Sequence, residues 1–343
     1  MKLWAIRVPT KLAEDTRRLL LQAGIIHPEA QLRRDNEYIL IPVNSKPDPD
    51  ELLELIGLET DDNLTFIEAE FETKLKKPFL EDILGFTPTF DVVGDIAIID
   101  ADDPDATRIA SALMEFRKSL KVVLGAVSHV EGEFRTRQFV VLAGEDRTHT
   151  VHKEYGCRYK VDLAGAYFSG RLGSERQRVA ETVKPGQCVV DLFAGVGPFS
   201  ILIGRTVPGA SVVAIDKNPT AVELLRENIL LNKVNNVWAV EDDAREAAER
   251  LEHRADHVIM NLPQSAREFL DSGISVARDG GMVHFYDITH EDDLYRTSWE
   301  LIQDAAVRQG RGVECVEKRI VRSYAPYQYN VCIEFQVTEN EQM

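Results

Sequence analysis

Two glycines and two aspartates mark the part of this chain in which ligand-binding chemistry is most evident. An apolar run ends in Asp191 and leads through Gly195 and Gly197 into a helical pattern, and a second apolar run ends in Asp216. Glycines allow the backbone to approach a ligand at the carboxyl end of a strand, and an acid after the next strand can accept hydrogen bonds from a ribose diol. This order of features predicts a site for a nucleoside cofactor.

Departures from the dinucleotide-binding fingerprint indicate which cofactor binds. Ser200 stands where the fingerprint has its third glycine, and the carboxylate of Asp191 would repel a pyrophosphate. A carboxylate there suits a cationic ligand such as the amino group and sulfonium of S-adenosylmethionine. Asp243, after the next strand, is placed to meet the adenine amino group and can also cap a helix. The cofactor is therefore predicted to be S-adenosylmethionine rather than a nicotinamide dinucleotide.

The motif Asn261-Leu262-Pro263 follows a further apolar strand and resembles the Asn-Pro-Pro-type motif of nucleic-acid aminomethyltransferases. With other motifs, it makes the whole chain resemble the archaeal tRNA (guanine-37-N1)-methyltransferase family, which also includes wybutosine-synthesis transferases. The other motifs are 191–199, 215–219, 318–326, 132–137, 142–148 and 167–176. One departure is Gly170, where the family usually has proline, which loosens a backbone turn.

The resemblance implies S-adenosylmethionine-dependent methylation of N1 of guanosine 37 in tRNA. Guanine N1 becomes nucleophilic only when its proton leaves and negative charge builds on O6, so the site needs a base and a cation. The resemblance assigns these roles to Glu175 and Arg135. Ser174 and Gln177 predict a capping box that fixes Glu175 in the first turn of a helix. The alternative for Glu175 is a helix-start carboxylate paired with an arginine, and for Arg135 a phosphate contact or surface ion pair.

The resemblance also implies two sets of binding residues. The cofactor set is Tyr167, Asp191, Phe193, Gly195, Gly197, Asp216, Asn218, Asp243 and Asn261. The substrate set is Arg135, Arg137, Arg171, Arg176, Asn261 and Pro263. Asn261 is expected to orient the flipped guanine, and Gln264 disfavours an exocyclic amine as the target because enzymes for such amines usually have an aromatic residue there. The histidines and four cysteines lack metal-ligand spacing, so no metal is predicted.

The charge distribution predicts a selective polyanion partner. The chain has 40 basic and 57 acidic residues, a net charge of −17, which argues against indiscriminate coating of nucleic acid. The stretch 107–178, however, has 13 basic and 8 acidic residues. The resemblance identifies the partner as tRNA, bound at its anticodon stem-loop and, through a small N-terminal domain, at its elbow. A monomer is expected. A location in the cytoplasm is expected because the sequence has no membrane-spanning tract, no secretion signal and no disulfide framework.

The elements that would position these residues predict an α/β protein of three domains. Residues 1–72 read as a small α/β tRNA-docking domain with strands at 2–8 and 38–43, a helix at 11–23 and a short helix at 51–56. Residues 73–165 read as an α+β domain with the basic patch, six short strands and a helix at 105–120. In residues 166–343, strands at 188–192, 211–215, 257–260 and 281–286 alternate with helices, which predicts a Rossmann-like doubly wound methyltransferase domain. The segment 324–329 is expected to connect the strands of a C-terminal hairpin.

Three other functions are alternatives to guanosine methylation. A wybutosine-pathway enzyme would transfer the aminocarboxypropyl group of the same cofactor, or methylate a tricyclic wyosine intermediate as well. Retention of Glu175, Arg135 and the Asn-Leu-Pro motif favours methyl transfer to guanosine. A nicotinamide oxidoreductase is disfavoured by Asp191 and Ser200, and a non-catalytic RNA-binding module would not need the ordered acids and Asn261.

Overall fold

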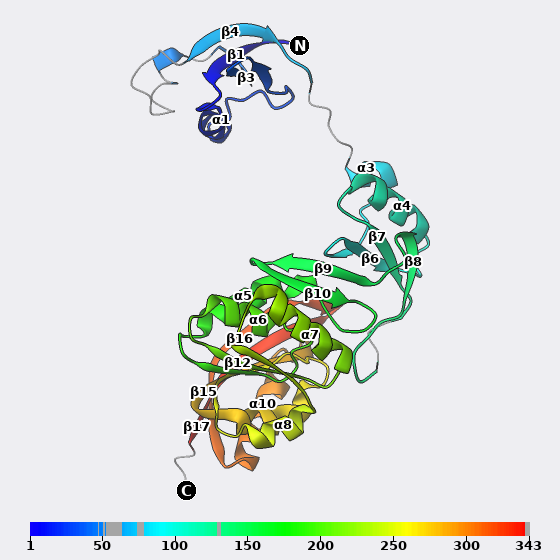
Figure 1. Cartoon of the computed structure of the whole chain (residues 1–343), viewed down its shortest axis with the longest axis vertical. Helices are drawn as coiled ribbons and strands as arrows, with labels where there is room; N and C mark the ends of the chain where they lie inside the picture. Colours follow the sequence, from blue (N-terminus) through cyan, green and yellow to red (C-terminus); the bar gives the residue numbers. More distant parts are fainter. Residues whose placement is uncertain (47, 51, 53–63, 74–78, 129–131, 340–343) are drawn as a thin grey trace. The chain divides into compact units, whose positions relative to one another are not determined.

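The computed structural model describes residues 1–46, 48–50, 52, 64–73, 79–128 and 132–339, which form two compact units, Met1–Phe79 and Leu80–Met343 (Figure 1). The short helix predicted at 51–56 falls almost entirely outside the described residues. The division into three domains at 72 and 165 stays a prediction. Within the described part of the chain, no helix is both long and apolar enough to cross a membrane.

The first unit is a four-stranded antiparallel sheet in the order β2-β3-β1-β4, with one helix packed on it. Its elements are β1 (Lys2–Pro9), α1 (Ala13–Gln22), β2 (Arg33–Asp35), β3 (Tyr38–Val43) and β4 (Thr65–Glu70). Alternate residues of β1, such as Ile6 and Val8, are fully buried and pack with Leu20 of α1 and Ile41 of β3. The two strands and the first helix predicted from the sequence are confirmed, with the helix shorter at both ends.

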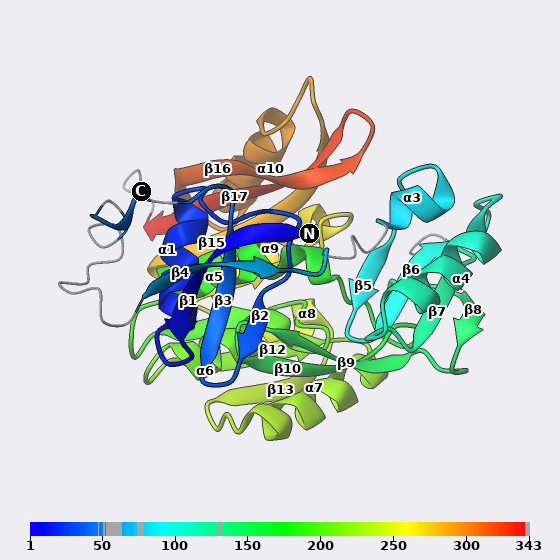
Figure 2. The same ribbon diagram turned by 90° about the horizontal axis from the view of Figure 1, so that it is seen from above.

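The second unit begins with a small mixed sheet in the order β5-β6-β7-β8. Its elements are α3 (Leu80–Leu84), β5 (Asp91–Val93), β6 (Ile96–Asp100), α4 (Ala106–Phe116), β7 (Val122–Ala126) and β8 (Phe139–Gly144). Ile109 and Leu113 on one face of α4 are fully buried, which holds the helix against β7 and β8 (Figure 2). The hairpin of β9 (His149–Glu154) and β10 (Cys157–Asp162) follows, and β10 packs on α7. All six predicted strands of this region are confirmed.

A seven-stranded sheet in the order β13-β12-β11-β14-β15-β17-β16 forms the rest of the second unit. Its strands are β11 (Cys188–Asp191), β12 (Ser211–Asp216), β13 (Val237–Glu241), β14 (Ala255–Met260), β15 (Ala277–His290), β16 (Arg311–Ala325) and β17 (Gln328–Glu339). The first five strands in this order pair in parallel. β17 pairs antiparallel with β15 on one side and with β16 on the other. The last two form the predicted C-terminal hairpin.

Helices cover both faces of this sheet because alternate residues of each strand point to opposite sides. Val189 belongs to the same buried cluster as residues of α5 (Gly173–Thr182), α6 (Pro198–Thr206) and α7 (Pro219–Asn232). Its neighbour Val190 belongs to the other cluster, with residues of α8 (Ala244–Arg250), α9 (Leu270–Val276) and α10 (Arg296–Arg308). The chain runs outward from β11 to β12 on one side and returns beside it as β14 on the other, which is the position where doubly wound sheets bind ligands.

Candidate active site

A cavity of about 320 Å³ opens at the carboxyl ends of β11, β12, β13 and β14. We call it the strand-end cavity. Eight of the predicted site residues line it: Arg135, Tyr167, Phe193, Gly195, Asp216, Asn218, Asp243 and Asn261. Residues of four successive strand ends and of the 132–135 loop thus meet at the switch point of the sheet.

The glycine loop gives the strand-end cavity its backbone wall. Gly195 and Gly197 have φ angles of +55° and +87°, in the left-handed region that glycine adopts without strain. Gly195 lines the cavity, and its N–H donates to Oδ2 of Asp216 at 2.7 Å. Gly197 instead precedes α6, where a Cβ would lie 2.3 Å from Cδ1 of Leu225. Gly195 is therefore placed to touch a ligand, whereas Gly197 makes the turn and close packing possible.

Asp216 is held in place by the loop that it supports. Its Oδ1 accepts a hydrogen bond from the N–H of Asn218 at 2.9 Å, in addition to the bond from Gly195 to Oδ2. Burial raises the pKa of this carboxyl, and the backbone N–H donors offset part of that effect. Each oxygen keeps a second lone pair, so the carboxylate can still accept two hydroxyl donors of a ribose.

Asp191 lies behind the strand-end cavity. Its side chain is 1% exposed, Oδ2 accepts a 2.7 Å hydrogen bond from Oγ of Ser200, and Oδ1 has no partner among the described residues. Burial raises the pKa of this carboxyl to about 7. A buried acceptor without a donor is costly, and a cationic group nearby would remove that cost.

Asn261, Asp243 and Asn218 show how the cavity's polar groups are set. Asn261 lines the strand-end cavity and has a buried Oδ1 for which the described residues provide no donor, so it can accept a hydrogen bond from a ligand. Asp243 and Asn218 are the N-caps of α8 and α7, through 2.9 and 3.0 Å bonds from the N–H of Arg245 and of Thr220. Asp243 thus caps a helix and also lines the cavity, the combination that the sequence allowed for it.

The strand-end cavity fits S-adenosylmethionine in both its apolar and its charged parts. The rings of Phe193 and Phe269 meet edge to face at 5.0 Å and form an apolar wall. Asp216, Asp242 and Asp243 give the lining acidic groups suited to a cationic amino acid and a ribose. The partnerless acceptor of Asn261 faces the same space.

A second cavity of about 180 Å³ shares Arg135 and Tyr167 with the first. It is also lined by Arg137, Arg171 and Arg322, and we call it the arginine cavity. The Nε atoms of Arg135, Arg137 and Arg322 are buried and have no acceptor in the part of the chain that the structure describes, whereas Arg171 pairs with Asp91. The four cations and one acid of this lining favour an anion as the ligand.

Arg135 stands at the junction of the two cavities. Its guanidinium carbon lies 5.2 Å from the centre of the Tyr167 ring, and its φ of +54° is unusual for a residue other than glycine. Burial lowers the pKa of Arg135, and the charges of Tyr167 and Tyr324 act in the opposite direction. An anionic or partly anionic oxygen beside Nε would therefore be stabilised.

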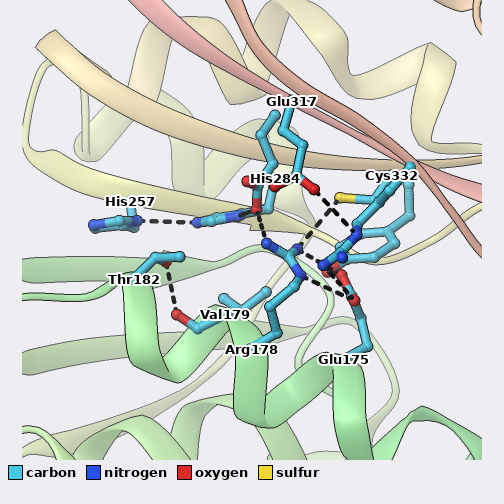
Figure 3. A network of polar contacts seen from close by, with 11 residues as sticks. Glu175, Arg178, Val179, Thr182, His257, His284, Glu317 and Cys332 are labelled. Carbon is cyan, nitrogen blue, oxygen red and sulfur yellow. Dashed lines mark hydrogen bonds and ion pairs between the residues drawn. The ribbon is translucent and has the colours of Figure 1, made fainter.

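Glu175 lies outside both cavities, in a buried network on α5 (Figure 3). Arg178 donates to both carboxylate oxygens at 2.7 and 3.1 Å, and Oη of Tyr286 donates to Oε1 at 2.7 Å. Arg319 adds an ion pair at 3.6 Å. The alternative considered for Glu175, a carboxylate near a helix start paired with an arginine, describes these contacts.

The predicted capping box before Glu175 is wrong. The N-cap of α5 is Leu172, without a side-chain hydrogen bond, because a 3₁₀ turn at Gly170–Leu172 runs directly into the helix. The serine that caps is Ser169, whose Oγ accepts from the N–H of Arg171 at 3.3 Å. Glu175 is nevertheless in the first turn, as expected.

Two predicted substrate residues have other surroundings. Arg176 is 2% exposed, donates to Oε2 of Glu154 and to the carbonyl of Ser169, and lines neither cavity. Pro263 lines neither cavity, and its carbonyl accepts from the N–H of Ile288. The structure adds Arg322 and Lys217 to the lining of the two cavities. Sequence reasoning did not assign these residues to the site, although they lie in the family motifs 318–326 and 215–219.

Comparisons with known proteins agree with this geometry. The model of the TRM5/TYW2 methyltransferase domain matches residues 150–315, the tRNA methyltransferase 5 N-terminal domain matches 5–51, and the TYW2 N-terminal domain matches 71–148. The tRNA (guanine(37)-N(1))-methyltransferase Trm5b of Pyrococcus abyssi is 40% identical over 346 residues, which cover 97% of this chain and 99% of that one. The chain belongs to the TRM5/TYW2 methyltransferase family.

Two solved structures of this family are informative. The complex of aTrm5 with tRNALeu is 33% identical, with a TM-score of 0.69 and coverage of 98% of this chain and 99% of that one. TYW2 of Methanocaldococcus jannaschii in complex with AdoMet is 30% identical, with a TM-score of 0.59 and coverage of 74% and 100%. The predicted family, fold class, methyltransferase activity and cofactor, S-adenosylmethionine, are confirmed.

Proposed function

We propose that this TRM5/TYW2 family member methylates N1 of guanosine 37 in tRNA, with Glu175 as general base and Arg135 stabilising the charge on O6. The observation that carries the proposal is the junction of the two cavities at Arg135 and Tyr167. The strand-end cavity suits a cationic nucleoside, and the arginine cavity suits a phosphodiester. A target base placed between them meets the cofactor on one side and keeps its backbone phosphate on the other.

Arg135 and Asn261 are the residues that would hold the base. The guanidinium of Arg135 is charged and lacks an acceptor at Nε, so it can donate to O6 as negative charge develops there. Asn261 offers a partnerless acceptor for a guanine N–H. S-adenosylmethionine, when bound, supplies the electrophilic methyl group.

Glu175 would accept the N1 proton only after one of its contacts is replaced. Its oxygens receive two bonds from Arg178 and one from Tyr286, and the contact with Arg319 is the longest at 3.6 Å. Arg319 lies on β16 and its side chain is partly exposed, so this is the contact that a substrate can most readily replace. The carboxylate would then face the base while Arg178 keeps it in position.

The rest of the tRNA would bind through the arginine cavity and the N-terminal unit. Arg137, Arg171 and Arg322 can neutralise backbone phosphates near the target nucleotide. The segment matching the tRNA methyltransferase 5 N-terminal domain lies in the first unit, which we propose docks on the tRNA elbow. Comparing full-length protein with Leu80–Met343 tests this: affinity for whole tRNA should fall, whereas affinity for an isolated anticodon stem-loop should not. Equal losses on both RNAs would exclude elbow docking.

The deciding experiment is mass mapping of the modified nucleoside. Purified protein, S-adenosylmethionine and an unmodified tRNA transcript should yield one methyl group on guanosine 37, and a transcript with adenosine at that position should yield none. The mass of an aminocarboxypropyl group would instead support the alternative activity. We favour methylation because the TYW2 structure corresponds to only 74% of this chain, whereas the guanosine methyltransferase relative corresponds to 97%.

A further inference from the structure

A buried polar chain continues from Glu175 in the direction away from Arg319, and the proposed function does not use it. Nη1 of Arg178 donates to Oε1 of Glu334 at 2.7 Å, and the same oxygen lies 2.6 Å from Nδ1 of His284. Nε2 of His284 lies 3.0 Å from Nδ1 of His257, whose Nε2 lies 3.1 Å from Oε1 of Gln187. His284, His257 and Glu334 are at most 5% exposed.

The side-chain oxygen of Gln187 determines the direction of each hydrogen bond in this chain. Its Oε1 already accepts from the N–H of Lys184 at 2.6 Å, which identifies it as the oxygen and makes it an acceptor toward His257. Nε2 of His257 must therefore carry the proton and donate. In a neutral His257, Nδ1 is then bare and accepts from Nε2 of His284.

His284 must donate at its other nitrogen as well. Its Nδ1 faces a carboxylate oxygen of Glu334, which only accepts. With N–H groups on both nitrogens, His284 is an imidazolium. A neutral His284 would require His257 to donate from Nδ1 and would leave the bare Nε2 of His257 facing Oε1 of Gln187, two acceptors at 3.1 Å.

The charges around the two histidines agree with this assignment. Burial, then the charge of His284, lowers the pKa of His257 to about 4, so His257 is neutral at pH 7. Burial would raise the pKa of Glu334, but the bond and charge of His284, with Arg178, lower it to about 2. Asp256 and Arg278 act on the far side of His257 with opposite signs. The charges alternate along His284, Glu334, Arg178 and Glu175.

We propose that His284 is a buried imidazolium that positions Glu175 through Glu334 and Arg178. Because His284 supports Glu334, Arg178 donates to Glu334 through Nη1 alone and keeps Nε and Nη2 for the two oxygens of Glu175. Loss of the imidazolium charge would make Glu334 compete more strongly for Arg178 and would raise the affinity of Glu175 for a proton. His284 is thus a positioning residue, and its catalytic consequence rests on the proposed role of Glu175.

Charge-deleting variants test the coupling by the sign of their effects. His284→Asn keeps a donor toward Glu334 but removes a positive charge, so the acidic limb of the single-turnover pH profile should move up by roughly one unit. Glu334→Gln should move it down, and the double variant should return it close to the native position, with the KM values for tRNA and cofactor unchanged throughout. His290→Asn, at an exposed histidine, is the matched control. Shifts of the same sign in both single variants, or no shift, would overturn the proposal.

Nuclear magnetic resonance separates this inference from the proposed function. In native protein labelled with ¹⁵N-histidine, His284 should show protons on both nitrogens at pH 7 and His257 a proton on Nε2 only. A neutral His284 would overturn the proposal without any variant. The carboxyl pKa of Glu175, followed by ¹³C, should rise in His284→Asn whether or not Glu175 is the base. If Glu175→Gln kept the native rate while these shifts were seen, only the proposed base would fail.

Discussion

The strand-end cavity and the Glu175 network are both rich in polar groups, but they differ in how those groups are satisfied. At the cavity, Asn261 and Arg135 have buried polar atoms without partners, and Asp191 behind it has another. In the network, every carboxylate oxygen of Glu175 is bonded, and Glu334 binds both Arg178 and His284. Since a partnerless buried group is costly, the first region is built for a ligand and the second is complete without one.

This difference bears on the two catalytic assignments. Arg135 is already where a ligand can take its free donor, whereas Glu175 must first give up a contact. An active-site base can be held in this way when the surrounding cations keep it charged and oriented until substrate arrives. If Glu175 had only a structural role, the network would not contribute to catalysis and only the cavity region would be part of the active site.

The largest effect is expected for Glu175→Gln. Glutamine keeps the size of the side chain but cannot accept the proton, so single-turnover methylation should fall by roughly 10²- to 10⁴-fold with little change in tRNA or cofactor affinity. Glu181→Gln, an exposed residue of the same helix, is the control and should keep the native rate. A Glu175→Gln protein that was less stable yet equally fast would return Glu175 to a structural role.

Asp191→Asn probes the partnerless acceptor behind the cavity. The pKa of Asp191 is raised to about 7 in the folded chain, so the folded state binds this proton more tightly than the unfolded state. The free energy of unfolding should therefore fall as pH rises from about 4 to about 7, by up to about 4 kcal/mol, and level off above that. In Asp191→Asn, the free energy of unfolding measured with urea in the absence of cofactor should no longer show this fall between about pH 4 and about pH 7. Asp304→Asn, on the exposed side of α10, should keep it, and parallel curves for native protein and Asp191→Asn would contradict the assignment.

Asp216→Ala tests the cavity wall itself. Removing the carboxylate should weaken S-adenosylmethionine binding by about 1.5 to 3 kcal/mol, or roughly 10- to 150-fold in Kd. Calorimetry measures this directly. Glu241→Ala is the control, because Glu241 pairs with Asp216 in register but is exposed and lies outside the cavity lining. Equal affinities of Asp216→Ala and native protein would remove Asp216 from the site.

Gly170→Pro should have the smallest effect. Ser169 is already extended, with φ −133° and ψ 121°, as the residue before a proline must be, and a Cβ on Gly170 would come no closer than 3.4 Å to His152 or Val92. The variant should gain about 0.4 to 1 kcal/mol in unfolding free energy at unchanged activity. Gly186→Pro, at a φ of +81°, should lose stability in the same thermal scans. Destabilisation by Gly170→Pro would show that the turn requires glycine.

The sequence predicted the sheet and the cavity better than the network. Apolar runs ending in Asp191, Asp216 and Asn261 indicate both the strands and the edge of the sheet where the cavity opens, since parallel strands end at one edge. The surroundings of Glu175 could not be read in this way. Glu334 lies 156 residues from Arg178, and only pairing of β15 with β17 places it beside His284.

The order of the last strands determines when the arginine cavity can form during synthesis. β17 lies between β15 and β16, so β16 joins the sheet only through a strand that follows it in the chain. Arg322 and Tyr324, which complete the arginine cavity, are on β16. The arginine cavity is therefore completed only after β17 has been synthesised, because β16 has no partner strand in the sheet until then.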